Sequence, residues 1–319
     1  MTDSPTYNVV SYRGTPYPFF AVPSKIDELR EIPLKDGDIV IATFPKCGTT
    51  VLQQIVLTLL ADGNKDVVTN PMEQSLWFEK TVSQGTIESL TSWVPDPLTQ
   101  GGGLTSELSP TTPRRVLKTH APSHLSPWKG GGVPDNSKII IMTRNPADTA
   151  ISMHHHTLDI PGFSYDGDFD HFLNELFLPG RVESGCFWEW HGGWQRLYEE
   201  ENNSERMLLV SYEDFKADPR ELITRVANFI FSGQGISSDS ARIDAAVESS
   251  TFSNMRSNAE SVDAKKKREG MVIKKNHIRQ GLSGAWRRVF TKEQEEMMEE
   301  WHRRKCKEWG LETESFNFL

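Results

Sequence analysis

Short, purely apolar runs alternate along this chain with longer stretches in which apolar residues recur at helical spacing. The run Ile39–Ala42 predicts a buried strand of a parallel sheet, although periodicity alone also permits a helical segment there. Similar runs over 115–120, 138–143 and 207–212 predict three more strands, and apolar spacing after Thr50 predicts an amphipathic helix. Strands alternating with helices indicate an α/β fold: a single domain with a central parallel sheet flanked by helices.

Capping residues mark the ends of two further helices. Asp218 is followed by Pro219 and has the pattern of a helix start. Thr291 and Gln294 form a capping-box pattern, and the helix that they begin is expected to end at Gly310.

The chain divides into an arm and a body. Residues 1–37 are Pro-rich and aromatic, and we expect them to form an N-terminal arm packed on a body that comprises residues 38–319. The segment 63–113 gives no clear pattern, and its glycine run at 101–103 indicates a loop. No linker rich in Gly, Ser or Pro divides the body, which favours one domain.

A polar, basic segment precedes Gly281. Its Lys and Arg residues at 265–268 and 274–275 predict a loop. Such a charge run is usually a solvated surface, but it could also cover a bound anion.

The charge balance limits the classes of partner. Lys and Arg number 35 against 44 Asp and Glu, a net charge of −9, which argues against a general nucleic-acid binder but permits a local basic pocket. Cys47, Cys186 and Cys306 fit neither a disulfide framework nor a zinc site, which favours a reducing compartment. Neither a signal peptide nor the ~20 apolar residues of a membrane span is found. We therefore expect a cytoplasmic protein without a membrane partner.

The loop Phe44–Thr50 joins the first predicted strand to the first predicted helix. Backbone N–H groups around Gly48 and at the helix start attract an anion, Lys46 adds a positive charge, and Thr49 and Thr50 offer hydroxyls. A Walker A loop places its lysine after the second glycine. Here the lysine precedes the glycine and the first glycine is missing. The loop is therefore a relative of the P-loop that suits Mg²⁺-dependent triphosphate hydrolysis poorly; the alternative is an ordinary strand–helix turn.

A second anion site is predicted at Arg144. This residue ends the third predicted strand, and open α/β sheets bind ligands at such strand ends. Its planar guanidinium suits a phosphate, and Ser152 could add a hydroxyl one or two helical turns later. Alone, the arginine would be an ordinary surface residue. Together with the first loop, it predicts a ligand with two separate phosphate-like groups.

Histidines supply the third signal. His120 follows Lys118 and Thr119 at another strand end, between the two anion sites. The run of histidines at 154–156 is no metal site, because adjacent helical residues cannot all face one ion, and it is expected to line a substrate cleft. The candidate acceptor-binding residues are Trp77, Phe78, Trp93, His154, His155, Phe187 and Trp188.

From about Gly37 to Gly310 the chain resembles the cytosolic sulfotransferases. The matching segments, in the order of that family, are 43–50, 118–120, 144–146 with Ser152, 212–214 and 279–281. The resemblance implies a P-loop NTPase-like fold. It also implies transfer of a sulfuryl group from 3′-phosphoadenosine 5′-phosphosulfate (PAPS) to a hydroxyl or amine of a small-molecule acceptor, without a metal. His120 would then be the general base.

The resemblance also implies roles in nucleotide binding. Lys46 and Lys118 would stabilise the developing charge, and Lys46 with Gly48, Thr49 and Thr50 would hold the 5′-phosphosulfate. Arg144, Ser152, Arg279 and Gly281 would hold the 3′-phosphate, with Tyr212 near the adenine and Phe252 stacked on it. The whole implied nucleotide site comprises Lys46, Cys47, Gly48, Thr49, Thr50, Val51, Arg144, Ser152, Tyr212, Ser250, Phe252, Arg279, Gln280 and Gly281.

The chain departs from the family pattern at three places. Val51 stands where the family usually has a tryptophan that stacks on adenine, and Gln280 replaces a basic residue near the 3′-phosphate. In the C-terminal dimer motif, Lys292 replaces an apolar valine. These departures predict weaker nucleotide binding and a monomer or weak homodimer.

Three alternatives compete with sulfuryl transfer to a small molecule. A P-loop kinase of a metabolite would need Mg²⁺ ligands and a phosphate-wrapping glycine that the sequence lacks. A nonenzymatic nucleotide-binding protein would not need Lys46, Lys118 and His120 together. Sulfation followed by elimination would use the same residues. The net charge of −9 favours a neutral or cationic acceptor over an anionic one.

Overall fold

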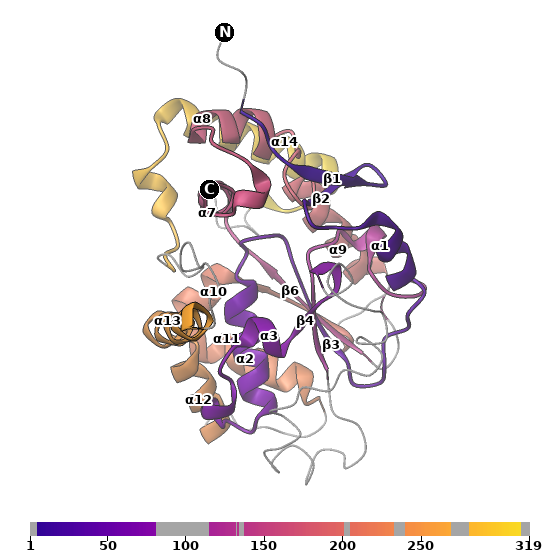
Figure 1. The fold of residues 1–319 in the computed structure, drawn as a ribbon, viewed down its shortest axis with the longest axis vertical. Coiled ribbons are helices and arrows are strands. Elements are labelled where there is room, and N and C mark those ends of the chain that lie inside the picture. The colour runs from indigo at the N-terminus through magenta and orange to yellow at the C-terminus, as the bar shows by residue number, and fades with distance from the viewer. Residues whose placement is uncertain are drawn as a thin grey trace.

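A five-stranded parallel sheet forms the centre of the molecule (Figure 1). The computed structural model describes residues 5–80, 115–131, 133, 137–200, 205–232, 240–268 and 281–313. The strands, in the order β4-β5-β3-β6-β7, are Leu76–Trp77, Val116–Thr119, Ile39–Thr43, Lys138–Thr143 and Met207–Ser211, and each pairs in parallel with its neighbours. The four predicted strands and the α/β class are confirmed, and the helical alternative for 39–42 is excluded.

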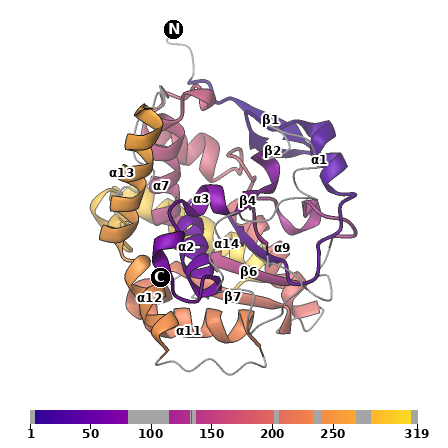
Figure 2. The same ribbon diagram turned by 60° about the horizontal axis from the view of Figure 1, so that its bottom comes forward.

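Helices cover both faces of this sheet, which explains why apolar residues dominate on both faces of its strands. Ile39 and Ile41 of β3 pack in one buried cluster with helices α2 (Thr49–Leu60), α11 (Pro219–Ile230) and α12 (Ala241–Ser249). Val40 and Ala42 point to the opposite face and pack with α7 (Pro146–Asp159), α9 (Phe187–Glu200) and α14 (Lys292–Trp309). Figures 1 and 2 show α2, α11 and α12 gathered on one side of the sheet. The chain thus forms a three-layer α/β domain.

The predicted helix ends agree with the structure. The Asp218 side chain accepts a hydrogen bond from the backbone N–H of Glu221, and both halves of the Thr291–Gln294 capping box form. Gly310 ends α14 with φ 68°. The remaining described helical segments are α1 (Pro23–Leu29), α3 (Pro71–Gln74), α8 (Phe169–His171), α10 (Tyr212–Ala217), α13 (Phe252–Arg268), short 3₁₀ turns at Lys65–Val67, Ser123–Leu125, Pro161–Phe163 and Ala285–Arg288, and a π-helical stretch at Phe172–Phe177.

The N-terminal residues form a hairpin that the sequence pattern did not predict. Strands β1 (Val9–Tyr12) and β2 (Thr15–Pro18) pair in antiparallel fashion before α1. The backbone N–H of Asn8 donates to the carbonyl of Phe163 at 2.8 Å, and that of Lys129 donates to Ile32 at 2.8 Å. These bonds connect the first residues with segments more than ninety positions away.

The prediction of a basic loop before Gly281 is wrong for residues 265–268, which belong to helix α13 (Phe252–Arg268). Helix α13 continues to Arg268, because the chain contains neither Gly nor Pro between 252 and 268. Lys274 and Lys275 lie outside the described residues. Among the described helices, none has both the length and the apolar content that a membrane span requires.

Candidate active site

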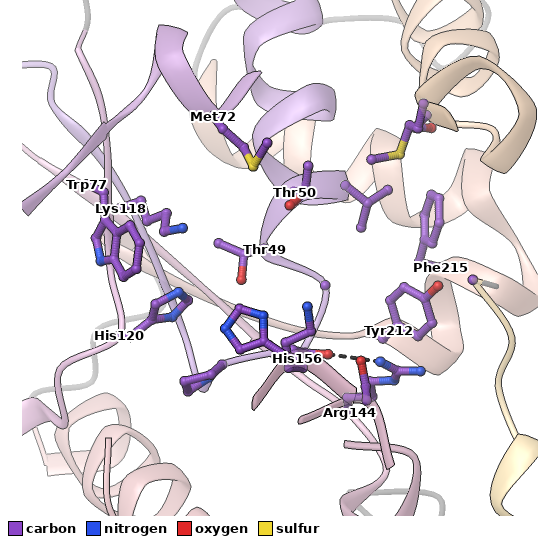
Figure 3. Close-up of a pocket in the computed structure, with 18 of the residues that line it drawn as sticks. Thr49, Thr50, Met72, Trp77, Lys118, His120, Arg144, His156, Tyr212 and Phe215 are labelled. Carbon is purple, nitrogen blue, oxygen red and sulfur yellow. Dashed lines mark hydrogen bonds between the residues drawn. The ribbon is translucent and has the colours of Figure 1, made fainter. Parts of the chain in front are cut away.

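A cavity of about 1010 Å³ lies where the parallel strands end (Figure 3). The residues that end or follow the strands line it: Trp77 of β4, Lys118 and His120 at β5, Pro45 and Lys46 after β3, Arg144 after β6 and Tyr212 after β7. Because parallel strands all finish at one edge of a sheet, residues spread over 167 positions, from Pro45 to Tyr212, meet there. The two predicted anion sites and His120 therefore share one cavity. The expectation that His120 lies between the two anion sites is wrong, because β5, which carries His120, and β6, which precedes Arg144, pair with β3 on its opposite sides.

The loop before α2 approaches the cavity with its backbone. Gly48 has φ 94°, and a Cβ there would lie 2.5 Å from Met142 Sδ and 2.9 Å from the Tyr212 ring. Only glycine therefore fits. Thr49 and Thr50 line the cavity at the start of α2, where backbone N–H groups have no partner within the helix. This is a suitable site for an anion.

Cys47 contributes to this loop differently from its neighbours. Its side chain is fully buried, with Sγ 3.5 Å from the Thr149 hydroxyl, and it is not among the lining residues. Burial raises the pKa of the Cys47 thiol to about 12. The thiol is thus a core group, and any contact of Cys47 with a ligand would come from its backbone.

Arg144 is held in place at the second anion site. Its guanidinium donates to the carbonyls of Lys46 at 2.9 Å and Leu282 at 3.1 Å, and it lies 4.7 Å from the centre of the Tyr212 ring (Figure 3). The Arg144 Nε is buried and has no hydrogen-bond partner within the described part of the chain. A fixed, charged guanidinium with a spare donor is suited to a phosphate.

Other predicted nucleotide-binding residues line the same cavity: Val51, Ser152, Ser250, Phe252 and Gly281. A Cβ on Gly281 would lie 2.7 Å from the Phe252 ring, so the backbone passes directly over that ring. The carboxylate of Asp148 on α7 accepts the N–H groups of Gly284 at 2.6 Å and Trp286 at 3.0 Å, which fixes the segment after Gly281. Arg279 and Gln280 lie outside the described residues.

The ring of His120 is oriented by the backbone of β3. Its Nδ1 lies 2.7 Å from the carbonyl oxygen of Thr43. A carbonyl oxygen can only accept, so Nδ1 carries a proton and the neutral ring keeps a lone pair on Nε2. Burial and the nearby Lys118 hold the pKa of His120 well below its usual range, so the ring is neutral at neutral pH.

Glu79 contacts the backbone of this histidine, and no sequence pattern predicted that contact. One oxygen of the buried Glu79 carboxyl accepts from the Thr119 hydroxyl at 2.5 Å and from the backbone N–H groups of His120 and Ala121, both at 3.1 Å. Burial raises the pKa of Glu79. Two of its three partners are backbone groups, so no side-chain pattern could have revealed the contact.

Lys118 brings a positive charge next to His120. Its Nζ lies 4.0 Å from the centre of the Trp77 ring, and the edge of that ring faces His120 at 5.3 Å between ring centres. Burial, opposed by Glu79 and Glu183, lowers the pKa of Lys118 to about 8. The amine is therefore charged at neutral pH and titrates just above it.

The predicted acceptor-binding residues are only partly on the cavity wall. Trp77 lines it, whereas Phe78, His154, His155 and Phe187 are not among the lining residues. Phe78 and Phe187 are core residues, in contact with Trp128 and His191 respectively, and Trp188 is a core residue that donates to His302. Trp93 lies outside the described residues.

Of the three histidines at 154–156, His156 lines the cavity. His154 Nε2 instead bonds to the carbonyl of Gly167 at 2.9 Å. Residues two apart on a helix point in nearly opposite directions, so one helix cannot present both. Among the described residues, no group of three or more His, Cys, Asp or Glu is arranged to hold a metal ion.

Several wall residues were missed because they come from distant segments. They are Phe19, Phe20, Met72, Ile160, Phe163 and Glu183. Phe19 meets Phe163 with ring centres 5.2 Å apart, and Phe20 meets Trp77 at 5.3 Å. These ring contacts depend on how the N-terminal segment folds against the rest of the chain, so local sequence could not predict them.

The family model described as the sulfotransferase domain matches residues 36–310. The chain belongs to the sulfotransferase family. Mouse sulfotransferase 1B1 is 29% identical to it over 298 residues, which cover 90% of this chain and 88% of the mouse protein. The amine sulfotransferase of Oryctolagus cuniculus is 25% identical, covering 95% and 92%. The resemblance drawn from the sequence segments is confirmed, and this sulfotransferase is a transferase enzyme.

Solved structures show the same fold. Mouse sulfotransferase SULT7A1 in complex with PAP superposes on this sulfotransferase with a TM-score of 0.67 and 22% identity, over 94% of this chain and 95% of the other. Retinol dehydratase in a complex with retinol and PAP gives a TM-score of 0.70 and 22% identity, over 95% and 90%. The P-loop-like architecture predicted from the sequence is thereby confirmed.

Proposed function

We propose that this enzyme transfers the sulfuryl group of PAPS to a hydroxyl or amine of a small-molecule acceptor and releases 3′,5′-bisphosphoadenosine (PAP). The observation that carries the proposal is one cavity in which the imidazole of His120 and two cationic groups, Lys46 and Arg144, meet at the ends of the neighbouring strands β5, β3 and β6. The presence of PAP in the structures of mouse SULT7A1 and retinol dehydratase supports the choice of donor.

The two anion sites match the two ends of the donor. Lys46 and the start of α2 would hold the 5′-phosphosulfate, at a loop whose tight turn against Met142 and the Tyr212 ring requires Gly48. Arg144, with its spare Nε and with Ser152 in the same wall, would hold the 3′-phosphate. Phe252 and Tyr212 offer rings for the adenine between them.

The reaction is an in-line displacement at sulfur. The acceptor oxygen or nitrogen forms a bond to sulfur, the bond from sulfur to the 5′-phosphate oxygen breaks, and PAP leaves with that electron pair. His120 Nε2 takes the acceptor's proton, because its partner Nδ1 is already protonated toward Thr43. Lys46 and Lys118 stabilise the charge on the sulfate and the leaving oxygen, as positioned cations do in phosphoryl transfer.

Donor binding also prepares His120 as a base. Burial, Lys118 and Lys46 all lower the pKa of His120 in the free protein. The negative donor would offset the two lysine charges, which raises the pKa of His120 toward the range of an effective base.

Two measurements test the proposal against a metabolite kinase. Calorimetric titrations should give PAP an affinity at least about tenfold higher than that of ATP, because ATP lacks the 3′-phosphate that pairs with Arg144. Transfer of radiolabelled sulfate from PAPS to an acceptor panel should continue in EDTA. Tighter binding of ATP, together with loss of activity in EDTA, would contradict the proposal and favour the kinase.

A further inference from the structure

A buried carboxyl group, that of Glu183, stands in the wall of the cavity. Glu183 lies just before α9 and is 3% exposed. One of its oxygens lies 3.4 Å from Nε2 of His156, and its backbone N–H donates to the Tyr7 hydroxyl at 3.1 Å. The Phe163 ring packs against both Tyr7 and His156, with ring centres 5.4 Å and 5.9 Å apart. The carboxyl therefore sits among aromatic groups.

The other carboxyl groups on this wall differ from Glu183. Asp148 is equally buried, but both of its oxygens accept backbone N–H groups. Glu73 is exposed, and Asp263 is half-buried. Glu183 thus differs from the other described carboxyl groups that line the cavity, because it is buried and has a side-chain imidazole beside its carboxyl.

The positive charges that act on Glu183 come from Lys46 and Lys118 and not from its neighbour His156. Burial, Lys46 and Lys118 hold the pKa of His156 well below its usual range, so His156 is neutral and supplies no countercharge. Burial raises the pKa of Glu183 to about 7, while the charges of Lys46 and Lys118 act to lower it. The countercharges of Glu183 are therefore the two lysines that the proposed function assigns to the sulfate of the donor.

Donor binding changes this balance. A bound phosphosulfate would share the charge of Lys46 and Lys118, which raises the pKa of Glu183 further and favours its neutral form. A positive group on the second substrate would restore the balance. The Phe19, Phe163 and Trp77 rings, which line the same cavity, suit a flat, apolar body attached to that group.

We propose that Glu183, with His156 beside it, binds a cationic nitrogen of the acceptor and so selects hydroxylated aromatic amines. This inference rests on the proposed function, since it assumes that the acceptor enters a cavity already holding the nucleotide. Glu183 acts in acceptor recognition; the proton transfer itself belongs to His120.

The test compares three phenols of similar shape and different charge on the PAP-loaded enzyme. The probes are tyramine, neutral 4-propylphenol and anionic 3-(4-hydroxyphenyl)propanoate, with dissociation constants measured by calorimetry at neutral pH. Tyramine should bind at least about tenfold more tightly than 4-propylphenol, and the propanoate should bind most weakly. Glu183→Gln removes the charge but keeps the shape, and should reduce the preference for tyramine to about threefold or less.

The controls separate this inference from the proposed function. Glu73→Gln changes an exposed carboxyl on the same wall and should keep the preference of the original protein. If the three phenols bind equally, if tyramine does not bind, or if the preference survives in Glu183→Gln, the inference is overturned. Should that variant fail to fold, the comparison of phenols on the unchanged protein decides alone. A protein that does not bind PAP would instead overturn the proposed function.

Discussion

The two halves of the cavity are built in different ways. The half assigned to the nucleotide is built around loops that follow strands of the sheet, with Lys46 and Gly48 after β3 and Arg144 after β6. The half assigned to the acceptor collects residues from unrelated segments, such as Phe19 and Glu183. A parallel sheet fixes where its strands end, so the first half can be inferred from local sequence. The second half depends on tertiary packing, which leaves it free to differ between relatives that share the first.

His120 stands between the two halves, and its removal should have the largest effect. His120→Ala should reduce kcat by about 10²–10⁴-fold, because the proposed function assigns to His120 the removal of the acceptor's proton. The affinity for PAP, measured by calorimetry, should stay within about twofold, since an imidazole deletion leaves the anion sites intact. Loss of PAP binding with retained turnover would show that the histidine belongs to the nucleotide half and is not the base.

Gly48→Ala tests the backbone of the nucleotide half. The positive φ costs an alanine about 1–2 kcal/mol, and the overlap of its Cβ with Met142 and Tyr212 adds about 1–3 kcal/mol. We expect a lower melting temperature and PAP binding weakened by about tenfold or more, measured by calorimetry.

Gly14→Ala is the matched control. Gly14 also has a positive φ, of 84°, but a Cβ there would meet nothing within 4 Å. It should therefore show only the conformational cost and bind PAP normally. If both variants bind PAP alike, close approach at Gly48 is not what forms the anion site.

Arg144→Ala should weaken PAP binding by about 10–100-fold, the value of charge-assisted hydrogen bonds to one phosphate. Adenosine 5′-phosphosulfate, which lacks the 3′-phosphate, should lose less affinity in the same variant. Competition binding with both nucleotides measures the difference. Equal losses would mean that Arg144 acts only through the carbonyls of Lys46 and Leu282.

The smallest effect is expected from pH. Lys118 has a pKa of about 8, lowered from its ordinary value, so it is charged below that pH and loses its proton as the pH rises through it. The kcat/KM for PAPS should therefore fall on the alkaline side with a midpoint of about 8. Lys118→Met should start lower and lack this fall. An unchanged alkaline limb in the variant would assign the titration to another group.

The sequence predicted four of the five strands of the central sheet, and many of the residues it proposed for nucleotide binding line the cavity. An apolar run such as 39–42 fits a central strand because helices cover both faces of the sheet. The position of a residue that follows a strand is set by the end of that strand. Contacts made by backbone groups could not be predicted in this way, and Glu79 beneath His120 is an example. Residues 265–268 were predicted as part of a loop from their charged composition, but they end helix α13, which contains neither Gly nor Pro.

The acceptor half shows where sequence patterns stop being informative. Phe78 and Phe187 are aromatic residues like Trp77, yet they pack in the core, because orientation and not residue type decides which ring meets the cavity. Within the histidine run, helical geometry selects His156 over His154. No local sequence pattern marked Glu183 as a site residue, because its proposed role depends on burial beside residues that are distant in the chain.

The bond from His120 to the Thr43 carbonyl has a consequence for how the protein matures. It exists because Ala42 is paired with Thr119, which sets His120 opposite the end of β3. A shift of one residue between these strands would turn the imidazole to the other face of the sheet. A compact chain with misaligned strands would therefore be inert, and turnover per molecule can serve as a measure of correctly assembled protein in a refolding experiment.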